Sequence, residues 1–449
     1  MQNTGSNREV HIYHASAGSG KTTMLLNCVE EHVRRGIPLS RIAFVTFSRK
    51  AAQVAQERVC RRFNAAMEQA VHFSTIHAMC FRALGCKKKD MMGREEYGMF
   101  GRKSGFPVSA GSAERACVDY GKLTRVELQA DEMLALQQLQ ETNTHLAKWV
   151  YNRRVQDGRE FVRFCTEYAK YKTTLGKRDF TDLLKDYLRT EGMEEDVDVA
   201  CIDEAQDCSP LQWQVLLKAF RKAKVIYIAG DDKQELFAYA GADSRILTGM
   251  RGQSHVMPIS YRVPSNILSF VQSNIVDTIE DVVKTQVEAN REGGEIRHIV
   301  RLEDVDWRKD KTYMLLGRTR AQLAIYVEFC QQHAIPYIYM GCLWRTQAER
   351  KKWVEGKTED ELCAKFANKG MLWQEAKVVI DTVHAVKGDE ADVVVMQSDM
   401  ARLPRRMYES GGMVRNWERK VLYVGCTRAK ETLYILEPKT KYYYRELGV

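Results

Sequence analysis

The sequence predicts an α/β protein with two parallel sheets in tandem and a largely helical insertion within the first sheet domain. Short apolar runs typical of buried parallel strands alternate with segments whose apolar residues recur at helical spacing. A highly charged stretch, 86–190, interrupts the first of these series. The chain has 449 residues, which is too many for one hydrophobic core.

The first series begins with a strand, a glycine-bearing loop and an amphipathic helix. Gly36 and Pro38 follow this helix and are expected to end it. A second strand and a second amphipathic helix come next. Strands are expected at 10–13, 41–47, 197–203 and 225–231. The apolar positions expected to be buried in the two helices are Met24, Leu25, Cys28, Val29, Val33, Ala51, Ala52, Val54, Ala55, Val59 and Phe63.

The second α/β series begins after about residue 258. Its strands are expected at 295–300, 312–316, 337–340, 378–383, 392–397, 421–425 and 432–436. The predicted domains are therefore a first sheet domain from 1–85 and 191–258, the helical insertion 86–190, and a second sheet domain from 259–449.

Composition narrows the class of protein only slightly. The net charge of +9 is compatible with a phosphate-backbone ligand but decides nothing alone. The 12 cysteines contain no C-x-x-C pair, so reduced thiols are expected rather than a zinc site. There is no apolar run of about 18 residues and the first residues are polar. We expect a soluble, cytoplasmic protein with no membrane contact, from a bacterium or a phage.

Residues 15–22, ASAGSGKT, join the first expected strand to the first expected helix and fit the phosphate-loop pattern except at Ala15. Small residues let backbone N–H groups surround phosphate oxygens, and a helix N-terminus favours negative charge. Lys21 is expected to reach the β- and γ-phosphates, and the Thr22 hydroxyl to bind Mg²⁺. A simple glycine-rich turn would leave this lysine unexplained. The residues predicted to hold the nucleotide are Ala17, Gly18, Ser19, Gly20, Lys21, Thr22 and Thr23.

Two adjacent carboxylates follow the third expected strand. Ligand groups in open α/β sheets lie at the carboxyl ends of strands, where Asp203 and Glu204 fall. Asp203 is expected to hold Mg²⁺, and Glu204 to orient and deprotonate the attacking water. Alone, the pair could also be a solvated turn; together with the phosphate loop it favours the nucleotide site. Phosphoryl transfer also needs cationic groups, for which Arg262 and Arg428 are candidates.

Read in order, these segments resemble the UvrD/Rep/PcrA group of superfamily 1 helicases. Besides the phosphate loop, the matching segments are TFSRKAA at 46–52, STIH at 74–77, DFTDLL at 179–184, DEAQD at 203–207, GDDKQ at 230–234, YAGAD at 239–243, SYR at 260–262, TVHAVKGDE at 382–390 and RKVLYVGCTRAKETL at 419–433. The resemblance implies two RecA-like motor domains, with 86–190 as the insertion called 1B.

The resemblance also implies roles for single residues at the nucleotide. Gln234 would sense the γ-phosphate, Tyr261 would stack on the adenine, and Glu390 would touch the ribose. Arg262 and Arg428 would reach the γ-phosphate from the second motor domain. The cofactors expected are therefore ATP and Mg²⁺.

The partners implied by the resemblance are single-stranded DNA and duplex junctions, with translocation in the 3′→5′ direction. Residues in the matching motifs that would contact the strand are Phe47, Thr75, His77, Tyr239 and His384. Stacking of aromatic side chains on bases tolerates any sequence. Packing in the core is the alternative for Phe47 and Tyr239, and nothing in the motifs excludes RNA.

The sequence departs from the family in three places. In one of them, Tyr239 stands where the family usually has tryptophan, and Asp389 where leucine is common. No glutamine motif precedes the phosphate loop, so we expect GTP to support appreciable activity. The family's large 2B insertion is expected to be missing or reduced to a remnant at 343–377, which favours an active monomer.

A DNA helicase is therefore the leading functional prediction. A translocase that displaces proteins from single strands with little unwinding is a near alternative. A nucleotide-gated interaction protein is a third, although Glu204, Gln234, Arg262 and Arg428 argue against it. Protein partners and pathway are not indicated.

Overall fold

The computed structural model describes residues 8–108, 128–156, 158–333, 335, 337–339 and 377–449. The chain divides into two compact units: Met1–Ala15 with Gly20–Met257, and Ser16–Ser19 with Pro258–Val449. Each unit contains one six-stranded sheet. The predicted 2B remnant at 343–377 lies outside the described residues except at its last position.

The sheet of the first unit has the strand order β3-β2-β4-β5-β1-β6, with every neighbouring pair parallel. Its strands are β1 (Glu9–His14), β2 (Ile42–Thr46), β3 (Phe73–Thr75), β4 (Val199–Ile202), β5 (Val225–Gly230) and β6 (Gln253–Val256). The four strands expected from apolar runs are present. The three-residue β3 and the largely exposed β6 were not expected, because neither carries a long apolar run.

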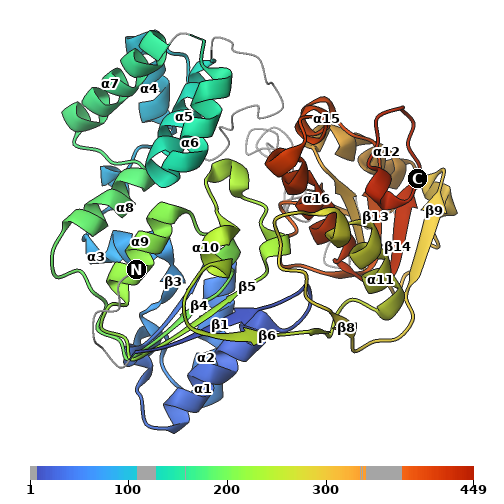
Figure 1. The fold of residues 1–449 in the computed structure, drawn as a ribbon, viewed down its shortest axis with the longest axis horizontal. Helices are drawn as coiled ribbons and strands as arrows, with labels where there is room; N and C mark the ends of the chain where they lie inside the picture. Colours follow the sequence, from blue (N-terminus) through green and yellow to red (C-terminus); the bar gives the residue numbers. More distant parts are fainter. Residues whose placement is uncertain (1–7, 109–127, 157, 334, 336, 340–376) are drawn as a thin grey trace, which may run out of the picture. The chain divides into compact units, whose positions relative to one another are not determined.

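Helices cover both faces of this sheet (Figure 1). On one face, α1 (Lys21–Arg34) and α2 (Arg49–Phe63) pack against side chains such as Phe44 and Cys201. On the other, α3 (Ile76–Ala83), α8 (Phe180–Arg189) and α9 (Pro210–Ala219) pack against Val45 and Ile202. Successive strand residues thus enter opposite cores, which explains why β4 is apolar at every position and β2 at every position except its last, Thr46. The short α10 (Ser244–Thr248) precedes β6.

The expected burial pattern of the two early helices is partly wrong. Val54 is 54% exposed, because Ala52, Ala55 and Val59 form the buried stripe of α2 and Val54 lies on the opposite side of the helix. Along α1, Leu26 is fully buried. The expected positions that are only half-buried are Met24, Cys28, Val33, Ala51 and Phe63.

The helical insertion contains α4 (Arg94–Ser104), α5 (Ala130–Thr142), α6 (Thr144–Arg154) and α7 (Gly158–Leu175). Its core is aromatic, with Phe100 edge-on to Phe164 and to Tyr168. α7 joins the sheet domain through Lys172, whose Nζ donates to Asp179 at 2.7 Å. Asp179 is also the N-cap of α8. The helical insertion in the first domain is therefore present as predicted.

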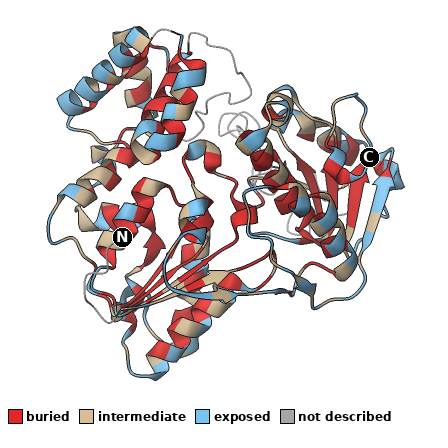
Figure 2. Ribbon diagram, in the orientation of Figure 1, coloured by how far each residue is buried: buried red, intermediate tan, exposed pale blue. Residues whose placement is uncertain are grey.

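The second unit has the strand order β11-β12-β10-β13-β14-β9, again entirely parallel. Its strands are β9 (Glu295–Ile299), β10 (Tyr313–Gly317), β11 (Tyr337–Tyr339), β12 (Val378–Thr382), β13 (Ala391–Gln397) and β14 (Ala429–Leu436). Figure 2 shows the central strands of this unit as buried, in contrast to the largely exposed edge strand β9. A separate parallel pair joins β7 (Ile259–Ser260) to β8 (Glu288–Ala289).

One expected strand is a helix. Residues 421–425 lie in α16 (Gly412–Cys426), which is buried from Lys420 to Cys426. A short apolar run cannot distinguish a buried strand from a helix enclosed on all sides, and here the helix is the structure. The other α-helices among the described residues of the unit are α11 (Ser265–Asn274), α12 (Ala324–Gln332) and α15 (Arg402–Glu409). Among the described residues, no helix is long and apolar enough to cross a membrane.

Candidate functional site

The phosphate loop connects the carboxyl end of β1 to the first residue of α1. Gly18 and Gly20 have φ values of 75° and 80°, a region in which a side chain would be strained, so both positions require glycine. Gly20 is the N-cap of α1 and offers no side chain to its first N–H groups. Those N–H groups and the buried Lys21 are suited to an anion.

The two residues predicted to hold Mg²⁺ lie together. The Thr22 hydroxyl donates a hydrogen bond of 2.6 Å to Asp203, which follows β4. Burial and the neighbouring Glu204 carboxylate raise the pKa of Asp203 to about 6, against the opposing effects of Thr22 and Lys21. A hydroxyl and a carboxylate fit Mg²⁺, which usually takes few protein ligands and completes its shell with water and phosphate oxygens.

Glu204 has a strained backbone. Its φ of 55° places it in the left-handed region, which costs a non-glycine residue about 1–2 kcal/mol. Such strain is concentrated at functional sites, where it fixes a side chain in a required position. Here it begins the short 3₁₀ turn Ala205–Asp207. The strain supports a special role for the Glu204 side chain.

A hydrogen-bonded chain links Glu204 to Gln234. The Gln206 amide donates to the Glu204 carboxylate at 2.5 Å, and its oxygen accepts from the Asp231 N–H at 3.0 Å. Gln234 in turn donates to the Asp231 carboxylate at 2.7 Å. Burial opposes ionisation of Asp231, but Lys233 and Lys21 outweigh it and lower its pKa.

Gln206, Asp231 and Lys233 were not predicted as site residues, although they lie in the segments DEAQD and GDDKQ that resemble the family motifs. Their polar side chains are almost completely buried, which only the structure reveals. Burial of so many polar groups at strand ends is the physical signal that marks them, because polar groups are rarely buried without partners.

The predicted nucleotide residues of the second unit occupy different environments. Tyr261 is 58% exposed, as a ring available for stacking would be. The Arg262 Nε lies 3.6 Å from the Glu390 carboxylate, so these two residues are brought together. Arg428 is fully buried and donates to the carbonyls of Val424 at 2.9 Å and Asp389 at 3.2 Å. These two hydrogen bonds fix the orientation of the Arg428 guanidinium group.

Aromatic side chains gather beyond the carboxyl ends of β2 and β5. Phe47 is 38% exposed and stacks on Phe237, with ring centroids 4.8 Å apart and an interplanar angle of 21°. The Tyr239 ring lies 6.3 Å from that of Phe237. Phe237 was not predicted, because a phenylalanine in a loop gives no periodic signal. The three rings form a surface on which bases could stack.

The remaining predicted DNA residues are two histidines and a threonine. Burial and Arg49 lower the pKa of His77 to about 4, and its ring meets Phe180 edge-on at 5.5 Å. Burial, Arg318 and Lys387 hold the pKa of His384 well below its ordinary value. Both rings are therefore neutral near pH 7. The Thr75 hydroxyl accepts from the Ala78 N–H at 3.2 Å as the N-cap of α3.

Comparison with protein families decides the assignment. The model of the UvrD/REP helicase N-terminal domain matches residues 3–255, and that of the UvrD-like helicase C-terminal domain matches 362–440. The chain belongs to the UvrD/REP helicase family. The first match alone covers more than half of the sequence and contains the phosphate loop, Asp203, Glu204 and Gln234.

Curated relatives of this UvrD/REP family member share low identity with it. The "Probable DNA helicase II homolog" of Mycoplasma genitalium is 22% identical over 62% of this chain and 42% of its own length. The "ATP-dependent DNA helicase Rep" of Salmonella typhimurium is 23% identical over 73% of this chain and 52% of its own. The "Probable DNA helicase" of Mycoplasma pneumoniae is 22% identical over 95% of this chain and 80% of its own. The chain thus spans about half the length of the first two.

Proposed function

We propose that this protein is a DNA helicase motor that hydrolyses ATP with Mg²⁺ and translocates 3′→5′ on single-stranded DNA. The observation that carries the proposal is the pairing of Thr22 with Asp203 beside the strained Glu204. It joins a phosphate loop, a site suited to Mg²⁺ and a candidate base at one edge of a sheet. Membership of the UvrD/REP helicase family supports the same reaction.

In the proposed mechanism, the phosphate loop and Lys21 bind the β- and γ-phosphates. Bound Mg²⁺, held by Thr22 and Asp203, would neutralise charge on those phosphates. Glu204 orients the attacking water and accepts its proton, while Gln206 holds the Glu204 carboxylate in place. Phosphoryl transfer depends mainly on positioning and charge, so a fixed base and fixed cations account for most of the catalysis.

Gln234 is proposed to contact the γ-phosphate and to report its loss. Its amide is bonded to Asp231, which is bonded through its N–H to Gln206. The loop that continues from Gln234 carries Phe237 and Tyr239. A shift of Gln234 on hydrolysis would therefore move the aromatic rings proposed to grip DNA. Arg262 and Arg428 are proposed to add positive charge at the γ-phosphate.

The test is ATP hydrolysis with and without single-stranded DNA, with the wild type beside Glu204→Gln. We expect stimulation of many fold by DNA and a loss of about 10²–10⁴ in kcat in the variant, because general base catalysis contributes about that much. Nucleotide binding should survive, since Lys21 and Thr22 are unchanged. An equal rate of ATP hydrolysis with and without DNA would contradict the proposal of a motor and favour a nucleotide-gated interaction protein.

The direction of translocation and the ability to unwind a duplex are tested with different DNA substrates. Duplexes with a 3′ or a 5′ single-stranded tail should be opened only from the 3′ tail. Release of a protein bound to the strand, without strand separation, would instead identify a translocase that unwinds poorly.

A further inference from the structure

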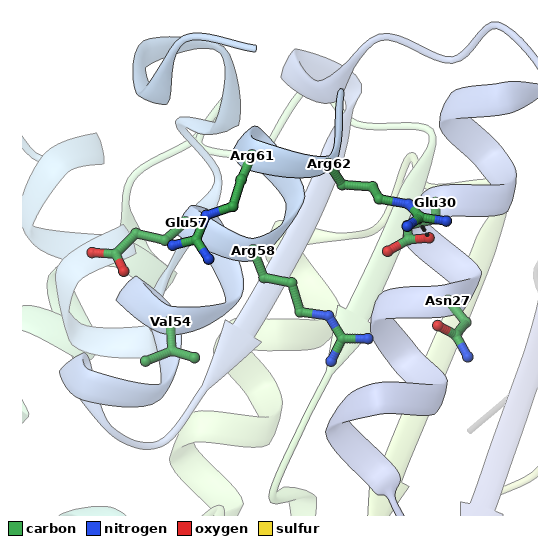
Figure 3. Close-up of a pocket in the computed structure, with 7 residues that line it drawn as sticks. All are labelled: Asn27, Glu30, Val54, Glu57, Arg58, Arg61 and Arg62. Carbon is green, nitrogen blue, oxygen red and sulfur yellow. Dashed lines mark ion pairs between the residues drawn. The ribbon is translucent and has the colours of Figure 1, made fainter. Parts of the chain in front are cut away.

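A hollow of about 730 Å³ lies between α1 and α2 on the outer side of the first unit. Three arginines, Arg58, Arg61 and Arg62, line it together with Val54 and Glu57 of α2. Asn27 and Glu30 of α1 complete the lining. In Figure 3, Arg58 and Arg62 extend from α2 toward the α1 side of the hollow.

The net charge of the side chains that line this hollow is positive. The lining contains three arginines and two glutamates, Glu30 and Glu57. Glu30 is already paired with Arg34 at 3.0 Å and with Arg62 at 3.5 Å. Arg58 meets only a neutral group, the Thr23 hydroxyl at 3.4 Å, among the contacts of the described residues. Arg61 is exposed and makes no hydrogen bond or ion pair within the described part of the chain.

The position of α2 connects this charge to the proposed path of the strand. Phe47, in the stacked aromatic group, is two residues from the start of the helix, and Ser48 is its N-cap. The three arginines lie about 15–21 Å from Ser48, measured along the helix axis. A strand that leaves the aromatic rings can therefore follow α2 and meet guanidinium groups that bind phosphate oxygens without reading bases.

We propose that the hollow formed by Arg58, Arg61 and Arg62 binds the phosphate backbone of single-stranded DNA beyond the aromatic contacts. This inference rests on the proposed function, because it extends the path of the same strand. The chemistry is sequence-independent and salt-sensitive, as a motor that grips any sequence requires.

The experiment compares the variant Arg58→Gln/Arg61→Gln/Arg62→Gln with a control, Arg221→Gln/Lys222→Gln/Lys224→Gln. The control removes three exposed positive charges just before the amino end of β5, a central strand of the same sheet. Affinity is measured for oligo(dT) of about 6 to about 30 nucleotides between about 50 and about 200 mM salt. Circular dichroism checks that both variants fold.

We expect equal affinity of all three proteins for the shortest oligonucleotides. For the long ones, the slope of log K against log salt should be smaller by about 2 in the α2 variant, because three phosphate contacts to a single strand contribute about 0.7 each. The control should keep the wild-type slope.

Equal slopes in both variants would overturn the inference. A poly-glutamate peptide that binds the wild type and not the α2 variant, with the DNA slope unchanged, would overturn it in favour of an acidic protein partner. DNA-stimulated ATP hydrolysis in the wild type separates these results from failure of the motor itself.

Discussion

Gln206 joins two residues on which the proposed mechanism depends. Its amide holds the Glu204 carboxylate and its oxygen accepts from Asp231, while the side chain is fully buried. Replacement by alanine frees the base and leaves a buried N–H without its partner, which costs about 1–3 kcal/mol. We expect Gln206→Ala to lower kcat by about 10–100-fold, a part of the contribution of a general base, with KM for ATP nearly unchanged.

Steady-state kinetics check this prediction, with the exposed Gln53→Ala as a control. A rise in KM with unaltered kcat would mean that Gln206 acts in nucleotide binding rather than in holding the base.

A substitution at Phe237 tests whether the aromatic surface binds DNA. Phe237 lies between Phe47 and Tyr239, and stacking on a base contributes about 1–3 kcal/mol. Phe237→Ala should therefore weaken binding of single-stranded DNA by about 5–150-fold and leave hydrolysis without DNA unaltered. Fluorescence anisotropy measures the affinity, with Tyr442→Ala of the second unit as the matched aromatic control. If the variant bound DNA as tightly as the wild type, the rings would contribute to packing and not to DNA binding.

Among the elements, the joint between α7 and α8 makes the sharpest prediction. Lys172 is buried and bonds to Asp179 at 2.7 Å and Asp182 at 2.5 Å. Removing the ammonium group leaves two carboxylates without their cation, and breaking a buried pair costs about 3–5 kcal/mol. We expect Lys172→Met to lower the midpoint of urea unfolding markedly. Lys170→Met, an exposed neighbour on α7, should leave the midpoint unchanged.

The elements also show what sequence patterns can predict. Central strands such as β2 and β13 were predicted because both of their faces are buried, which favours continuous apolar runs. The same rule was wrong at 421–425, since α16 is buried on all sides and has the same kind of run. The phosphate loop and the Thr22–Asp203 pair followed from motif and strand order. The left-handed Glu204 did not, because the residue type does not indicate a positive φ. The bond between Gln206 and Asp231 did not either, because it joins residues 25 positions apart.

For the whole molecule, acid should act first through the histidines whose pKa is lowered by burial, which are His14, His32, His77 and His384. His77 has a pKa of about 4 and His384 a pKa well below its ordinary value, whereas both titrate near about 6.5 when unfolded. Between these values the unfolded chain binds more protons at these histidines than the folded protein, so their contribution to stability falls as the pH is lowered from about 6.5 toward about 4. Asp203, whose pKa is raised to about 6, has the opposite effect over part of this range.

The depressed carboxylates act only at lower pH. Hydrogen bonds from Arg41 and Lys224 lower the pKa of Asp198 to about 2. Bonds from Thr312 and Lys430 outweigh burial and lower that of Asp392 to about 2 as well. Their contribution is present above about pH 4 and is lost as the pH falls through about 2.

Urea unfolding at a series of pH values separates the two groups. His77→Gln should make the unfolding midpoint depend less on pH between about 6.5 and 4, because one of the histidines with a lowered pKa is gone. His145→Gln, which changes an exposed histidine, should keep the wild-type dependence. A His77→Gln profile parallel to the wild type would show that the pKa of His77 is the same in the folded and the unfolded protein, which would contradict the lowered pKa.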